Sequence, residues 1–200
     1  YEIRNNIFIG SKNDGIQLIS YDVNTGKVFN IHHNIFRECN AALGCMADSN
    51  TVENLNGAPK MDERVYFYNN TVTENNIAAT GGNNIIAVNN IIYNNKLGGF
   101  KRFGKNSVIV HNLFFKNNNE DFLEINPAVV KNKNIFHKDP LLDKNTFAPE
   151  AKSPCINQGI KQFIFEGKTV LTIPPDMFMG AGPDLGAVEI KSKYPGSPLR

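Results

Sequence analysis

The chain lacks the features of several large functional classes. No stretch of its 200 residues approaches the roughly 18 consecutive apolar residues of a membrane-spanning helix. The net charge of +2 is small, and no basic run is interleaved with aromatic residues. A metal-ligand spacing, a phosphate-binding loop and a nucleophile elbow are also missing. The sequence therefore predicts neither a membrane span nor a nucleic-acid partner, and it contains none of these catalytic or binding motifs.

Cysteine is scarce as well. Cys39, Cys45 and Cys155 form an odd set, so they cannot all pair within one chain. Cys39 and Cys45 fall in the same repeat and could form a disulfide, but free cysteines are also common in buried cores. Both alternatives stay open on the sequence alone.

What the sequence has instead is a repeated motif, an asparagine followed by residues that are mostly large and apolar. The anchor asparagines are Asn6, Asn34, Asn70, Asn90, Asn112 and Asn134. Successive anchors are 28, 36, 20, 22 and 22 residues apart. Self-similarity at such a period is typical of a solenoid.

The residues around each anchor fall into columns of constant character. Two residues after it the column is always apolar: Phe8, Phe36, Val72, Ile92, Phe114 and Phe136. Three residues before it the column is apolar in all but the last copy: Ile3, Ile31, Phe67, Ala87, Ile109 and Lys131. The residue just before the anchor is polar and should face water: Asn5, His33, Asn69, Asn89, His111 and Lys133. This alternation, rich in Val, Ile, Phe and Tyr, predicts short strands that bend at the asparagine.

A period near 22 residues without a helical stretch excludes leucine-rich and ankyrin repeats and favours the coils of a parallel β-helix. Equivalent residues of stacked coils lie about 4.7–4.9 Å apart, so the anchors could form a ladder of hydrogen-bonded amides. The sequence thus predicts an all-β, right-handed parallel β-helix over residues 1–136, with an irregular capping segment of the same domain over residues 137–200.

The repeat resembles the right-handed parallel β-helix proteins that are widespread among secreted bacterial polysaccharide lyases and glycoside hydrolases. The matching pattern is a Val/Ile strand, then Asn-Asn-Ile-Phe or Asn-Asn-Ile-Ile, then a Gly-Ile-like strand, and it covers roughly residues 1–137. The tail is similar to the segment that ends many of these enzymes, with Asp139-Pro-Leu, Ser153-Pro-Cys-Ile-Asn-Gln-Gly and Pro183-Asp-Leu-Gly-Ala-Val-Glu. The resemblance implies a polysaccharide substrate and a secreted or periplasmic location.

The chain starts at Tyr1, already inside a repeat, and an uncovered solenoid end exposes strand edges and core. We therefore expect an N-terminal continuation or a partner chain over the first coil. In the tail, Asp139, Asp184 and Glu189 stand beside Pro and Gly, which favours turn and capping roles over catalysis.

The candidate site lies in the first coils, where two long insertions, residues 20–27 and 46–64, leave the repeat. Two residues before the anchor, on the outward face, stand Arg4, His32 and Tyr68, and the column then turns apolar. These three types suit β-elimination from a uronate: Arg neutralises the carboxylate, His or Tyr removes the C5 proton, and Tyr protonates the leaving oxygen. Further contacts to substrate carboxylates are predicted from Arg37, Lys60 and Arg64.

One alternative concerns how the lyase would neutralise charge, and two others concern the class of function. Calcium could supply the neutralising charge through Asp14, Asp22 or Asp48. A glycoside hydrolase would need two carboxylates across a cleft; its candidates are Asp14, Asp22, Glu38 and Asp48. A noncatalytic carbohydrate-binding or structural β-helix segment is the third class.

Overall fold

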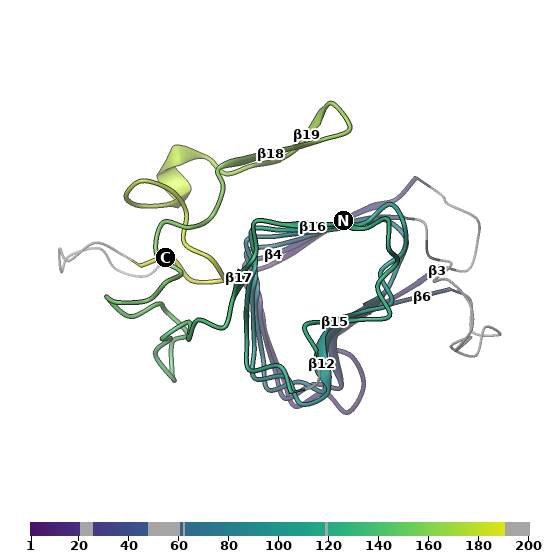
Figure 1. Cartoon of the computed structure of the whole chain (residues 1–200), viewed down its shortest axis with the longest axis horizontal. Coiled ribbons are helices and arrows are strands. Elements are labelled where there is room, and N and C mark those ends of the chain that lie inside the picture. The colour runs from purple at the N-terminus through teal and green to yellow at the C-terminus, as the bar shows by residue number, and fades with distance from the viewer. Residues whose placement is uncertain (21–25, 48–60, 62, 119, 191–200) are drawn as a thin grey trace.

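The fold follows from the repeat columns. A computed structural model describes residues 1–20, 26–47, 61, 63–118 and 120–190 (Figure 1). Within these residues the chain winds into a right-handed solenoid of three parallel sheets, in which each of the first five coils contributes one strand to every sheet and the sixth coil contributes to two. The fold class predicted from the sequence is confirmed. Three candidate residues, Asp22, Asp48 and Lys60, and most of both insertions lie outside the described residues.

The three solenoid sheets have these strands. Sheet A contains β1 (Glu2–Arg4), β4 (Val28–His32), β7 (Arg64–Tyr68), β10 (Ile85–Val88), β13 (Val108–Val110) and β16 (Val130–Asn132). Sheet B contains β2 (Ile7–Ile9), β5 (Ile35–Arg37), β8 (Thr71–Thr73), β11 (Ile91–Tyr93), β14 (Leu113–Phe115) and β17 (Ile135–Phe136). Sheet C contains β3 (Ile16–Ser20), β6 (Ala41–Ala47), β9 (Ile77–Gly81), β12 (Gly98–Lys101) and β15 (Phe122–Leu123). The C-terminal segment adds an antiparallel hairpin, β18 (Gln162–Phe165) with β19 (Lys168–Thr172), and a short 3-10 helix, η1 (Pro175–Met177).

The anchor asparagines form the predicted ladder. In each coil up to the fifth, the backbone N–H and the side-chain amide of the anchor both donate to Oδ1 of the next anchor, at 2.8–3.2 Å. The four central members, Asn34, Asn70, Asn90 and Asn112, are completely buried. An amide side chain is suited to this position because it both donates and accepts, so that every rung satisfies its neighbour.

The residue before each anchor makes the bend between sheets A and B. All six members of this column have φ between 48° and 58°, the left-handed region that asparagine tolerates better than most residues. Their exposure differs from the expectation that the column faces water. Asn69 and Asn89 are buried because the C-terminal segment covers them: Asn69 donates to Asp184 O, and Asn89 pairs with the backbone of Ile160.

A second asparagine ladder, which the sequence analysis does not predict, lies at the bend between sheets B and C. The Cys39 N–H donates to Asn75 Oδ1, and the amides continue from Asn75 to Asn95 and Asn117. Asn117 then donates to Asp121 Oδ1 at 2.8 Å, so a carboxylate of the same coil ends this ladder.

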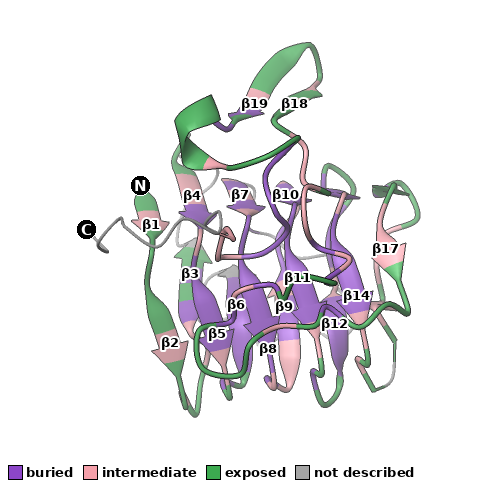
Figure 2. Ribbon diagram, turned by 90° about the vertical axis from the view of Figure 1, so that its left-hand side faces the viewer, coloured by how far each residue is buried: buried purple, intermediate pink, exposed green. Residues whose placement is uncertain are grey.

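The C-terminal segment lies along the side of the solenoid (Figure 2). The hairpin packs on the outer face of sheet A, where Leu171 and Ile173 join Val88 and Val110 in one buried cluster. A preceding loop crosses the outer face of sheet B, where Cys155 packs with residues that include Ile91, Leu113 and Leu185. The C-terminal segment thereby shields parts of the outer faces of sheets A and B from water and forms a small hydrophobic cluster with each of them.

Acidic residues of this segment hold its backbone. Asp184 is 2% exposed and accepts hydrogen bonds from the N–H groups of Asn157 and Ile190. Glu189 accepts from those of Met179 and Asp184. These contacts give both carboxylates a structural role. The three cysteines, Cys39, Cys45 and Cys155, are buried and free, so Cys39 and Cys45 do not pair.

Candidate functional site

The strand register places the three predicted catalytic residues side by side on sheet A. Arg4 of β1 pairs with His32 of β4, and His32 pairs with Tyr68 of β7. The next members of the column are Val88 and Val110, as the sequence indicated. Outward-facing ionisable groups are therefore gathered on the first three coils, and the hairpin covers the continuation of the column.

His32 lies at the centre of this cluster and is more buried than its outward position suggested, with 6% of its surface exposed. Its ring stacks on Tyr68, with ring centroids 4.5 Å apart and planes 8° from parallel. Its Nε2 is 3.1 Å from Glu2 Oε1, and its Nδ1 is 2.7 Å from Nδ1 of His33. Burial lowers the pKa of His32, although the Glu2 carboxylate opposes that effect.

His33 is held at the bend by its left-handed backbone, φ 53°, and its ring stands edge-on to Tyr68. Burial, followed by the neighbouring His32 and Arg4, lowers the pKa of His33 to about 4. Both imidazoles are consequently neutral at physiological pH.

The contacts determine the tautomers of the two neutral rings. A carboxylate only accepts hydrogen bonds, so His32 must donate to Glu2 from Nε2–H. Its Nδ1 then carries a lone pair and can only accept, so His33 donates from Nδ1–H. This assignment leaves Nε2 of His33 unprotonated. The chain Glu2, His32, His33 is therefore a relay that ends in an unprotonated nitrogen, which can accept a proton.

The other two members of the cluster have complementary properties. Burial raises the pKa of Tyr68 to about 12, so its phenol remains protonated and can act as a hydrogen-bond donor or acid. Arg4 is half-exposed and pairs through Nε with Glu2 Oε1 at 3.2 Å. A proton acceptor, a proton donor and a cation thus stand within one cluster.

Glu2 and His33 are the two residues that the sequence reasoning missed. A signal for Glu2 was present, because it stands two residues before Arg4 on the same strand and strand side chains alternate with period two. His33 belongs to the polar column that is expected to face water, and nothing in the sequence shows that a residue with a left-handed backbone turns its ring back onto its neighbour.

Comparison of the chain with known proteins gives no match. No family model, curated protein or solved structure matches the chain. The described residues also contain no helix long and apolar enough to cross a membrane. The function must therefore be inferred from the chemistry of the residues themselves.

The predicted substrate-binding arginines lie apart from one another and are engaged in other contacts. Arg37 on sheet B pairs with Glu74 at 2.6 Å and with Glu38 at 3.0 Å. Arg64 on sheet A lies over the Phe165 ring of the hairpin, 5.5 Å from its centroid. Arg64 thus helps to hold the hairpin that borders the cluster.

Of the carboxylates proposed for hydrolysis, the structure describes Glu38 and Asp14, and these two lie in different surroundings. Glu38 is exposed at the bend beside Arg37, whereas Asp14 packs against Gly44 with Oδ2 buried. The charges of Asp14 and Glu63 both raise the pKa of the Cys45 thiol, after the larger effect of burial, which places this pair beside a core residue. Glu63 is 4% exposed, so the pair offers no open cleft.

No metal site stands out in the part of the chain that the structure describes. It contains no group of three or more His, Cys, Asp or Glu residues that could hold an ion. Of the proposed calcium ligands only Asp14 is described, so the calcium hypothesis stays a prediction.

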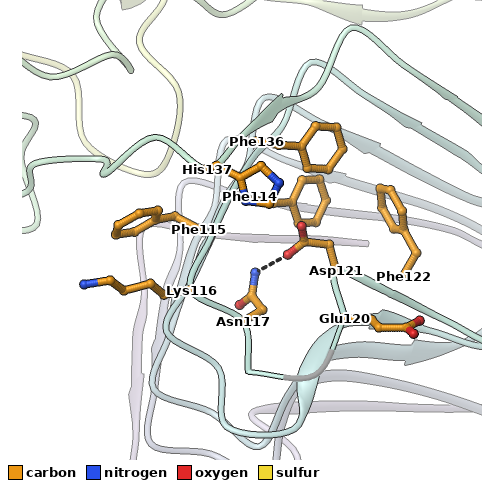
Figure 3. Close-up of a pocket in the computed structure, with 9 residues that line it drawn as sticks. All are labelled: Phe114, Phe115, Lys116, Asn117, Glu120, Asp121, Phe122, Phe136 and His137. Atoms are coloured by element: carbon orange, nitrogen blue, oxygen red, sulfur yellow. Dashed lines mark hydrogen bonds between the residues drawn. The ribbon is translucent and has the colours of Figure 1, made fainter.

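The last coil carries a hollow of about 610 Å³ at its open end (Figure 3). Phe114, Phe122 and Phe136 line its inner side, and Asp121 holds the end of the second ladder. Outside the residues that line the hollow, the exposed Lys131 of β16 occupies a column that is apolar in the other five coils, with its ammonium 6.0 Å from the Phe122 ring centroid. A charge in this column at the edge of the solenoid discourages further strands from stacking on the last coil.

Proposed function

We propose that the chain is a carbohydrate-active β-helix protein that cleaves an acidic, uronate-containing polysaccharide by β-elimination. The observation that carries this proposal is the relay from Glu2 through His32 to His33, placed beside Arg4 and Tyr68. Each of the three tasks of β-elimination has a candidate group within this cluster.

The reaction would use the groups as follows. Arg4 binds the uronate carboxylate and withdraws charge from it, which stabilises the carbanion that develops at C5. His33 Nε2 accepts the C5 proton, and the resulting imidazolium donates from Nδ1–H to His32. The Glu2 carboxylate, bonded to the far nitrogen of His32, stabilises the positive charge on the relay.

Tyr68 completes the elimination. As the C4=C5 double bond forms, the C4–O bond breaks and the leaving oxygen takes the phenolic proton. The imidazolium of His33 can then return its proton to the tyrosinate, which restores the enzyme. In the substrate the C5–H and C4–O bonds have broken, and the C4=C5 double bond and the O–H bond of the leaving group have formed. The low pKa of His33 keeps its nitrogen available, and the high pKa of Tyr68 keeps its proton in place.

A polymeric substrate would reach the cluster from the N-terminal side of the hairpin. Because the hairpin packs on Val88 and Val110, the binding groove would extend over the first three coils and any coil that covers the first. A polymer of this kind is extracellular, so we also propose a secreted or periplasmic location.

The test is an ultraviolet assay on pectic, alginate and glycosaminoglycan substrates. A lyase creates a 4,5-unsaturated end that absorbs in the ultraviolet, whereas a hydrolase creates reducing ends without that absorbance. His33→Asn, Arg4→Ala and Tyr68→Phe should each lower kcat/KM by at least about tenfold, roughly 1.4 kcal/mol of transition-state stabilisation. Asparagine suits position 33 because Asn5, Asn69 and Asn89 occupy the same left-handed bend in other coils.

Two variants serve as controls. Tyr93→Phe removes a half-buried phenol from the outer face of sheet B, and His137→Ala removes an exposed histidine of the last coil. Both should retain full activity. Unchanged activity in all three site variants, with the fold intact, would refute the proposed site, and new reducing ends without ultraviolet absorbance would identify a hydrolase instead.

A further inference from the structure

A second groove, separate from the relay, runs between the C-terminal hairpin and the last strands of sheet A. It has a volume of about 440 Å³, within the usual range of ligand pockets. Its floor contains the buried side chains of Val108 and Val110, and its opposite wall contains Phe163 and Phe165. These two rings are nearly parallel, with their planes 14° apart, and line the hairpin side together.

The polar groups of the groove are amides and bases. His111 and Lys133 occupy the left-handed bends of successive coils, Asn132 ends β16, and Gln162 begins β18 on the opposite wall. No carboxylate is among the described residues that line it. Burial and the charge of Lys133 lower the pKa of His111, so Lys133 is the cation of the groove.

We propose that this groove binds a uronate-containing oligosaccharide and is a second saccharide-binding site on the same sheet as the relay. The choice of a uronate rests on the function proposed above. Sugar rings present flat C–H faces that pack on aromatic walls such as Phe163 and Phe165. The carboxylate would pair with Lys133, and hydroxyl groups would bond to the amides of Asn132 and Gln162.

The groove is distinct from the catalytic cluster. The cluster is built on β1, β4 and β7, whereas the groove uses β13 and β16 at the other end of the same sheet. Val88 of β10, which lies between the two sets of strands, is buried in the cluster that the hairpin completes. The two sites therefore flank the hairpin, and the groove would increase affinity for a polymer without taking part in the chemistry.

The experiment measures binding by calorimetry to a uronate trisaccharide and to a neutral trisaccharide of the same linkage, with His33→Asn as the background so that the ligand is not consumed. Lys133→Asn removes the charge and keeps a residue that tolerates the bend. We expect it to weaken uronate binding at least about tenfold, the loss of one charge-assisted contact. Gln162→Ala should weaken binding less, and Lys152→Asn, outside the groove, should leave the affinity unchanged.

Three outcomes would overturn the assignment: equal affinity for the neutral trisaccharide, no effect of Lys133→Asn, or displacement of the uronate by a fatty acid such as dodecanoate, which would identify an apolar carboxylate as the ligand. The assay also separates this proposal from the lyase. In the otherwise wild-type chain, Lys133→Asn should leave elimination from short substrates unchanged. Binding at the groove without any unsaturated product would refute the lyase alone.

Discussion

The asparagine ladder makes a quantitative prediction at Asn90, its most central buried rung. Oδ1 of Asn90 accepts hydrogen bonds from the backbone N–H and the amide of Asn70, at 2.9 and 3.1 Å. Its own amide donates to Phe67 O and to Asn112 Oδ1, both at 2.8 Å. Asn90→Ala removes all four bonds and leaves the backbone N–H of Asn70 without its acceptor in a site that water does not reach.

The expected cost follows from the groups left unpaired. A buried polar group that loses its partner costs about 1–3 kcal/mol. The backbone N–H of Asn70 loses its acceptor, as does the Asn70 side-chain amide, which still donates to Ile31 O. Phe67 O loses one donor, and Asn112 Oδ1 loses one donor but still accepts from the Asn90 N–H. We therefore expect Asn90→Ala to lower the free energy of unfolding by about 4 kcal/mol. Asn90→Asp should cost at least as much, because a carboxylate oxygen would then face Phe67 O.

Urea unfolding followed by far-ultraviolet circular dichroism measures this change. Asn118→Ala is the matched control, since Asn118 is exposed and no hydrogen bond of its side chain is described; it should change stability by less than about 0.5 kcal/mol. Asn6→Ala should cost less than about 1 kcal/mol, because Asn6 only donates within the ladder and its loss orphans no buried donor. Equal costs for Asn90→Ala and Asn118→Ala would show that the ladder does not stabilise the solenoid.

Two further predictions concern titration and the tail. Because the folded pKa of His33, about 4, lies below the ordinary value of 6.5, the contribution of its neutral ring to the free energy of unfolding is fully present above pH 6.5 and is lost as pH falls toward 4. His33→Asn should therefore make stability less dependent on pH over that window, and an unchanged pH dependence would contradict the burial of this imidazole. Asp184→Ala leaves two backbone N–H groups unpaired and should cost about 3 kcal/mol, whereas the exposed Asp176→Ala should cost almost nothing. The folded Asp184→Ala protein should keep its activity per molecule, and selective loss of activity without loss of stability would assign Asp184 to the site.

Most of the solenoid could be predicted from local chemistry. The ladder and the two apolar columns are repeated at a fixed offset, so the coil and the pairing of Arg4, His32 and Tyr68 follow from aligning the copies. The second ladder at Asn75, Asn95 and Asn117 carried the same kind of signal, an asparagine five residues after the anchor, but only three coils show it.

What the sequence by itself determined is the register, because a strand side chain alternates between two faces and a buried face tolerates no shift. Tertiary structure alone decided which outward positions stay open. The C-terminal segment buries Asn69, Asn89, Val88 and Val110, although nothing in the spacing of the repeats shows where a segment 71 to 115 residues later will pack. Tertiary structure also decided the relay. The left-handed bend at His33 and the stacking of His32 on Tyr68 bring two imidazoles of one coil to the Glu2 carboxylate of the preceding coil, and this contact between coils fixes the protons of both rings.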